Sequence, residues 1–145
     1  MRFADSTFGS PSVFGSLHDR GDGMFSVAPF GINHPTTREY EPGTNVLVTT
    51  WKTPNGWIVV RTALTMGRSD HEDEITPHTR PPADDDADHM LVRTVECLEG
   101  RVEVELICEP MFGYGREPAT WTLVDESRHT ADATGAGQTI RLQTD

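Results

Sequence analysis

Residues 102–109 read Val102-Glu103-Val104-Glu105-Leu106-Ile107-Cys108-Glu109, and over most of this stretch apolar side chains alternate with acidic ones. Because successive side chains of a β-strand point to opposite faces, the pattern predicts a strand in an antiparallel sheet with one buried face and one solvated face. Residues 91–98 form a second apolar run, and Glu99-Gly100 lies between the two. We therefore expect residues 91–98 and 102–109 to form one hairpin.

A second hairpin is predicted upstream, where β-branched runs cover residues 45–51 and 57–64. The sequence between them is Thr53-Pro54-Asn55-Gly56. Asn-Gly is the preferred pair for a tight turn, since both residues tolerate a positive φ. This turn would make Trp51 and Trp57 close cross-strand partners, so packing is the expected role of both side chains.

Further short strands are predicted at residues 24–28, 120–124, 127–133 and 138–142, between segments rich in Gly, Pro and Asp. Residues 67–88 form a polar connection that contains too many prolines for a helix and too many charges for a strand. Seven or eight short strands with regular turn signals are typical of an antiparallel sandwich. We predict an all-β, antiparallel β-sandwich that forms a single domain over residues 1–145.

The chain is acidic, with 23 Asp and Glu residues against 12 Lys and Arg residues and a formal net charge of -11. This charge repels nucleic-acid phosphates and anionic lipid headgroups, so neither nucleic acid nor membrane is an expected partner. No segment approaches the roughly 18 consecutive apolar residues of a membrane helix, and the first residues have no apolar signal region. The expected location is the cytoplasm.

Two cysteines occur, Cys97 and Cys108. In the predicted tight hairpin Cys97 faces Val102 and Cys108 faces Leu91, which separates the thiols by roughly 20 Å along the ladder, too far for a disulfide. Two reduced thiols acting as small core hydrophobes are expected, in agreement with a cytosolic compartment.

Several segments together resemble one family. They are Phe8-Gly9-Ser10-Pro11-Ser12-Val13-Phe14-Gly15, Tyr40-Glu41-Pro42-Gly43-Thr44-Asn45-Val46-Leu47, Leu91-Val92-Arg93 and Phe112-Gly113-Tyr114-Gly115-Arg116. Their order and spacing resemble the N-terminal β-sandwich domain of bacterial trehalase-like enzymes of glycoside hydrolase family 15. In that family the catalytic carboxylates lie on a separate (α/α)6 barrel, which is absent from these 145 residues.

The resemblance implies a non-catalytic domain that packs on the barrel and frames the substrate entrance of an enzyme that cleaves an α-glucoside such as trehalose. The residues expected at the substrate rim or at the docking surface are Ser10, Phe14, Tyr114 and Arg116. Two departures stand out. The family's chains begin with a further hairpin, which implies that this sandwich lacks its first strands. A chain with such an open edge would pair with a second copy through that edge, be less stable, or be an incomplete gene product. Gly113 also replaces an aspartate that is usual in the family.

No catalytic, metal-binding or cofactor-binding residue is assigned. A carboxylate pair at some suitable distance is almost inevitable among 23 acidic residues, so it does not indicate glycoside hydrolysis. The loop residues His71, His78 and His89, with Asp73 and the acidic run 84–88, include metal-ligand types but lack the short spacing that places ligands together. A solvated acidic loop is the favoured interpretation.

Three functions remain open at this point. The first is the accessory domain of a trehalase-like hydrolase, with the barrel of the same or a related chain as its partner. The second is a freestanding module that binds carbohydrate through its tryptophans, or a protein through an open sheet edge. The third is an inactive truncated remnant.

Overall fold

The computed structural model describes residues 2–3, 13–15, 23–65 and 90–145. These residues form β-strands joined by turns and contain no helix, so they also contain no helix that could cross a membrane. The strands are β1 (Arg2–Phe3), β2 (Met24–Pro29), β3 (Thr37–Tyr40), β4 (Leu47–Thr53), β5 (Gly56–Leu64), β6 (Leu91–Gly100), β7 (Val104–Glu109), β8 (Met111–Phe112), β9 (Glu117–Pro118), β10 (Thr120–Leu123), β11 (Thr130–Gly135) and β12 (Gln138–Gln143). Every pairing is antiparallel, which confirms the predicted fold class.

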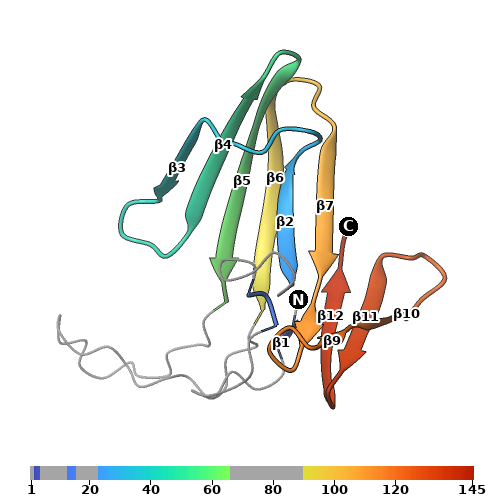
Figure 1. The fold of residues 1–145 in the computed structure, drawn as a ribbon. Coiled ribbons are helices and arrows are strands. Elements are labelled where there is room, and N and C mark those ends of the chain that lie inside the picture. The colour runs from blue at the N-terminus through green and yellow to red at the C-terminus, as the bar shows by residue number, and fades with distance from the viewer. Residues whose placement is uncertain (1, 4–12, 16–22, 66–89) are drawn as a thin grey trace, which may run out of the picture.

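The largest sheet has the strand order β3-β4-β5-β6, and Figure 1 shows it as the tall part of the molecule. Its central strand β5 pairs with β4 on one side and with β6 on the other. The register places Trp51 opposite Ile58 and Thr49 opposite Val60. All four side chains are buried, so this face of the sheet is the one that the rest of the molecule covers.

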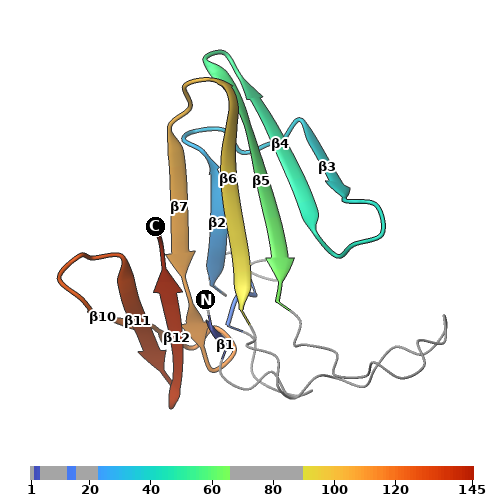
Figure 2. The same cartoon turned by 180° about the vertical axis from the view of Figure 1, so that it is seen from behind.

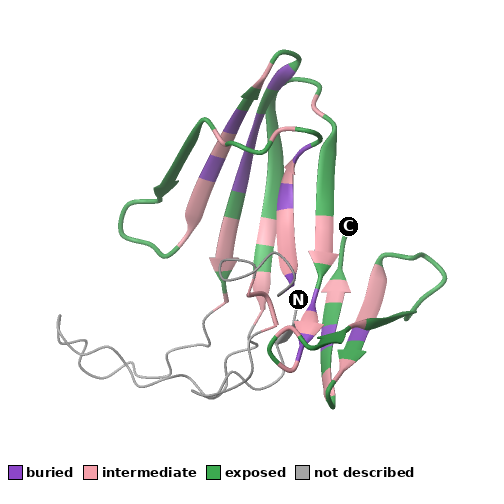
Figure 3. Ribbon diagram, viewed as in Figure 1, coloured by how far each residue is buried: buried purple, intermediate pink, exposed green. Residues whose placement is uncertain are grey.

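A two-stranded ribbon of β2 and β7 supplies the cover. Val27 of β2 packs against Trp51, Ile58 and Val60 in one buried cluster, with Val102 at its margin. Figure 3 shows the buried positions concentrated on β2, β4 and β5. Within the described residues, β2 and the large sheet share side-chain packing but no ladder of backbone hydrogen bonds.

A second, smaller sheet has the order β1-β12-β11-β10 and lies beside the β8–β9 ribbon, as Figure 2 shows from behind. Its own core consists of Phe112, Ala133 and Ile140. Gly135 is required here because a Cβ atom at this position would lie 2.3 Å from the Phe112 ring. The strands predicted over residues 120–124, 127–133 and 138–142 are confirmed, although β11 starts later because Ser127 bonds Asp125 in a turn.

The predicted hairpin of residues 91–98 with 102–109 is wrong. The two strands exist, but β6 pairs with β5, whereas β7 pairs with β2. The connection between them bonds to other parts of the chain: the Arg101 amide donates to the Asn55 carbonyl, and the Glu103 carbonyl accepts from the Phe30 amide. These bonds lead β7 away from β6 and toward β2.

The cysteines change neighbours for the same reason. Cys97 lies opposite Ile58 and Cys108 lies opposite Phe25, so the predicted neighbours Val102 and Leu91 are wrong. Both thiols are free, as expected. Cys108 is half-buried, but Cys97 is exposed and is therefore not a core residue.

The turn between β4 and β5 forms where it was predicted but with different chemistry. Its central residues are Pro54 and Asn55, and the Thr53 hydroxyl accepts hydrogen bonds from the Asn55 and Gly56 amides. Gly56 does not have a positive φ. It is a glycine because a Cβ atom there would lie 2.3 Å from the Glu99 carbonyl oxygen of β6.

This register also separates the two tryptophans that were expected to pair. Trp51 lies opposite Ile58 and Trp57 opposite Lys52, so their side chains lie on opposite faces of the sheet. Trp51 is 6% exposed, whereas Trp57 is 36% exposed and lies beneath the Lys52 ammonium, which is 4.5 Å from the ring centroid. Packing is confirmed for Trp51, but not as a Trp–Trp pair.

The difference in burial predicts a difference in stability. Trp51→Ala removes a core side chain and is expected to lower the free energy of unfolding by about 3–5 kcal/mol. Trp57→Ala removes a surface cation–π contact and should lower it by less than about 1 kcal/mol. Urea unfolding of the two variants beside the parent chain measures both values. Equal losses would mean that the tryptophans act as a pair and would contradict the register.

The cysteine environments predict selective alkylation. Burial raises the pKa of the Cys108 thiol to about 11, an effect that the nearby Arg93 guanidinium only partly opposes. At pH 8 the thiolate fraction of Cys108 is then roughly one in a thousand, so alkylation of the folded chain should stop at one thiol per molecule. Mass spectrometry after iodoacetamide treatment should locate the label on Cys97, and Cys97→Ser should remove it. Rapid labelling of Cys108 in the folded chain would contradict this assignment.

Candidate functional site

The four residues predicted at a substrate rim or docking surface fall into different settings. Ser10 lies outside the described residues. Phe14 is half-buried, packs against the core of Phe112, Ala133 and Ile140, and has its ring centroid 5.8 Å from that of Phe25. Phe14 thus links the small core to β2.

Tyr114 and Arg116 lie in the turn between β8 and β9. Gly113, Tyr114 and Gly115 all have positive φ, at 59°, 61° and 79°. A left-handed backbone is uncommon for a tyrosine, and here it turns the phenol outward, where it is 64% exposed. The Arg116 side chain is also exposed. The two side chains are available to a partner, as a rim role requires.

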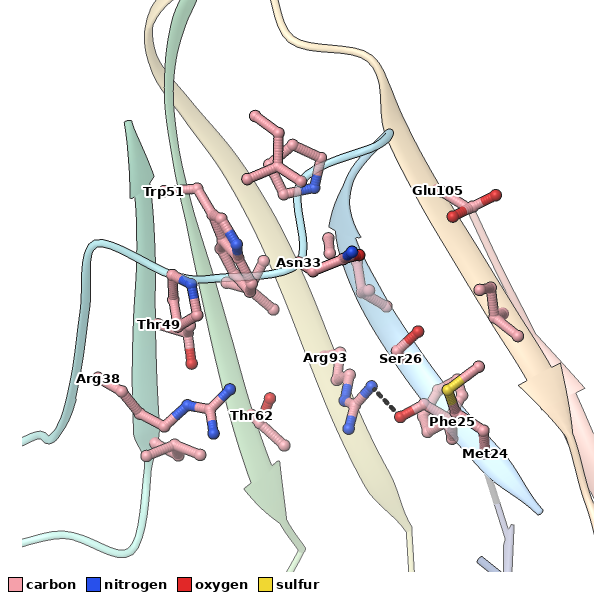
Figure 4. A pocket seen from close by; sticks show the side chains of 18 of the residues that line it. Met24, Phe25, Ser26, Asn33, Arg38, Thr49, Trp51, Thr62, Arg93 and Glu105 are labelled. Carbon is pink, nitrogen blue, oxygen red and sulfur yellow. Dashed lines mark hydrogen bonds between the residues drawn. The ribbon is translucent and has the colours of Figure 1, made fainter. Parts of the chain in front are cut away.

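A cavity of about 470 Å³ lies on the face of the large sheet that β2 covers. The strand register builds it: Arg38 of β3, Thr49 of β4 and Val60 of β5 form one cross-strand row, and Thr62 lies opposite Arg93 in the next row. The walls are β2 on one side and β3 on the other, and Figure 4 shows Asn33 reaching over the cavity from the loop after β2.

Arg93 connects this cavity to β2. Its Nη1 atom donates a hydrogen bond of 2.9 Å to the Phe25 carbonyl, and its guanidinium carbon lies 4.2 Å from the Phe25 ring centroid. Burial removes water from this guanidinium, and the desolvation lowers its pKa. Figure 4 shows Arg38 extending toward Thr62 from the opposite side.

Two polar atoms of residues that line the cavity are buried and lack a hydrogen-bond partner within the described part of the chain. They are the Nε1 atom of Trp51 and the Nε atom of Arg93. A buried donor without a partner loses a free energy comparable to a hydrogen bond, so such groups are rare unless a bound molecule satisfies them. Each of these nitrogen atoms carries a hydrogen and can donate a hydrogen bond but cannot accept one.

A second hollow, of about 450 Å³, lies between β6 and β7 and is called the β6–β7 groove below. Its apolar lining residues are Phe25, Val27, Leu91, Val92, Val95, Val104, Leu106 and Leu142. Val95 is 45% exposed and Leu106 is 43% exposed. The groove is open because β6 and β7 each lie at the edge of their own sheet.

No group of three or more His, Cys, Asp or Glu side chains in the described residues is placed to hold a metal ion. The loop candidates His71, Asp73, His78, His89 and residues 84–88 lie outside the described part of the chain. The predicted solvated acidic loop falls on these residues and stays a prediction.

Sequence reasoning missed both hollows. A signal for the cavity was present, because Arg93 shares a strand face with Val95 and Cys97, where an apolar residue would be expected. The β6–β7 groove had no such signal, since the predicted hairpin would have closed it by pairing the two strands.

Comparisons with known proteins place the chain beside two mycobacterial enzymes. It is 50% identical to a trehalase of Mycolicibacterium smegmatis over 113 residues, which are 77% of this chain and 17% of the relative. It is 45% identical to a trehalase of Mycobacterium tuberculosis over 141 residues, which are 93% of this chain and 21% of the relative. No family profile and no solved structure matches. The chain spans about one fifth of the length of these relatives, and it is homologous to that β-rich part of a trehalase.

Proposed function

We propose that the chain is the non-catalytic β-domain of a trehalase-like enzyme of glycoside hydrolase family 15. In the intact enzyme it packs on a catalytic (α/α)6 barrel and frames the entrance through which trehalose, an α-glucoside, reaches the catalytic carboxylates. The observation that carries the proposal is the extent of the match: 93% of this chain aligns with only 21% of a trehalase. A segment of that kind contributes one domain to a larger enzyme.

Two carboxyl groups of the described residues are unsuited to act as the general acid of a glycosidase. A glycosidase needs a general acid whose pKa is raised so that it is protonated near neutral pH. The described carboxyl groups with shifted pKa values are Asp125 and Asp132, and both pKa values are lowered, by hydrogen bonds from Ser127 and Arg141 respectively. Each of these carboxylates is stabilised in its charged form and is a poor proton donor.

The β6–β7 groove supports a packing role. Exposed valine and leucine side chains gathered on open strand edges mark contact surfaces rather than solvated ones. Tyr114 and Arg116 add an exposed phenol and guanidinium on the same molecule, groups suited to hydrogen bonds across a domain boundary or with sugar hydroxyls. The open edges also support association of two isolated copies through a sheet edge.

The remaining parts of the proposal follow from the same features. One domain over residues 1–145 is supported by Phe14, which links the small core to β2. A cytoplasmic location is supported by the two free thiols.

A freestanding carbohydrate-binding module is the competing function, and the observation that favours it is Trp121 on β10, which is 39% exposed.

A domain exchange tests the proposal. The homologous one fifth of the M. tuberculosis trehalase would be replaced by this chain, and trehalose hydrolysis by the chimera would be compared with the parent enzyme and with a deletion of that segment. The chimera is expected to keep most of the parent activity, and the deletion is expected to lose it. Binding of trehalose by the 145-residue chain alone, together with an inactive chimera, would favour the carbohydrate-binding module.

A pair of substitutions in the chimera tests the docking surface. Leu106→Glu places a charge in the β6–β7 groove and should lower activity and thermal stability of the chimera by weakening the domain contact. Leu123→Glu makes the same chemical change at an exposed site on β10 and should leave both within about twofold and a few degrees of the parent chimera. Equal effects of the two substitutions would show that the β6–β7 groove is not the docking surface.

A further inference from the structure

We propose that the cavity between β2 and the large sheet binds a small hydroxylated monocarboxylate through Arg38 and Arg93. The proposal concerns a site on the β-domain itself and does not depend on the role proposed for that domain. The first observation is that positively charged side chains line this cavity although the chain as a whole is acidic. The whole chain carries a net charge of -11, yet two guanidinium groups line one cavity.

Among the charged groups of the lining, donors outnumber acceptors, with two guanidinium groups against the Glu105 carboxylate. Arg38, Arg93 and the Nε1 atom of Trp51 donate and cannot accept. A neutral sugar needs both donors and acceptors, because each hydroxyl group does both, and in most sugar sites it also needs an exposed aromatic face. Trp51 is 94% buried, since 6% is exposed, and presents no such face. A ligand that mainly accepts hydrogen bonds fits this lining better.

Arg93 retains a donor that pairs with no described residue. Arg93 uses Nη1 to hold Phe25, which leaves its buried Nε atom without a partner. The Nε1 atom of Trp51, a residue of the same lining, has no partner among the described residues, and Arg38 forms no ion pair within the described part of the chain. A carboxylate has two oxygens in one plane and matches the planar edge of a guanidinium.

The net charge of the lining side chains favours a ligand that carries one negative charge. Arg38 and Arg93 contribute two positive charges and Glu105 at the margin contributes one negative charge, which leaves +1. A monocarboxylate neutralises this charge, whereas a phosphate dianion would leave an excess negative charge inside an already acidic chain.

The hydroxylated part of the ligand is inferred from the rest of the lining. Ser26, Asn33, Thr49 and Thr62 supply hydroxyl and amide groups around the two arginines. A volume of about 470 Å³ exceeds what a bare carboxylate fills and suits a molecule of about the size of a six-carbon sugar acid. Figure 4 shows Thr62 between Arg38 and Arg93, with Thr49, Ser26 and Asn33 around them.

Calorimetric titration of the 145-residue chain with gluconate, glucose and inorganic phosphate tests the proposal. Gluconate and glucose differ mainly by the carboxylate, so gluconate should bind with one site per chain and glucose at least about tenfold more weakly. Arg38→Gln removes an exposed guanidinium that forms no hydrogen bond or ion pair with another described residue, and it should weaken gluconate binding about tenfold. Arg61→Gln, which removes the same charge from the opposite face of the sheet, should change it less than about twofold.

A second measurement avoids substitution of Arg93, because any such substitution would also remove the contact with Phe25. The chain has three tryptophans, so a nitrogen–proton correlation spectrum of the labelled protein contains three indole signals. Gluconate should shift the Trp51 signal, identified with Trp51→Phe, and leave the Trp121 signal in place. Equal binding of glucose and gluconate, stronger binding of phosphate, or an unchanged affinity in Arg38→Gln would each overturn the proposal.

Discussion

The contact of Val27 with Trp51, Ile58 and Val60 holds the two layers of this molecule together. Within the described residues no backbone ladder joins β2 to the large sheet, so the layers depend on side-chain packing and on the Arg93 hydrogen bond to Phe25. Burial of apolar area stabilises such a contact without fixing a direction, whereas the Arg93 bond fixes the position of β2 along the sheet. The cavity and the β6–β7 groove are both consequences of this arrangement.

The two hollows have different chemistry because they lie at different borders of β2. On one side, β2 meets a sheet face that carries Arg38, Thr62 and Arg93, and the resulting cavity combines these groups with apolar side chains. On the other side, the strands β6 and β7 separate and expose aliphatic side chains between them. A cavity with two guanidinium groups suits a small charged ligand, whereas a groove with exposed aliphatic side chains and open edges suits another protein surface. The two hollows share Phe25, Val27 and Arg93 in their linings, so the proposed docking role and the proposed ligand site use adjoining parts of one fold.

Most individual strands were predictable because their signals are local. The alternation in residues 102–109 and the β-branched runs around Pro54-Asn55 depend only on neighbouring residues, and the corresponding strands β4, β5 and β7 formed. Strand pairing was less predictable. The hairpin of residues 91–98 with 102–109 failed because Arg101 and Glu103 bond to Asn55 and Phe30, residues more than forty positions away in the sequence. A shift of register moves side chains to the other face, which is why Trp51 and Trp57 were wrongly expected to touch.

The sequence by itself determined the all-β class, the position of most strands and the relation to trehalases, because alternation, turn residues and segment order are properties of the linear chain. Of the predicted rim residues, the sequence also indicated Tyr114 and Arg116 as turn residues beside glycines, and the structure leaves both exposed. Only the tertiary structure decided which strands pair, which tryptophan is buried and which arginines line one cavity. Arg38 and Arg93 are far apart in the sequence, and they line one cavity because three successive strand pairings place them on the same sheet face.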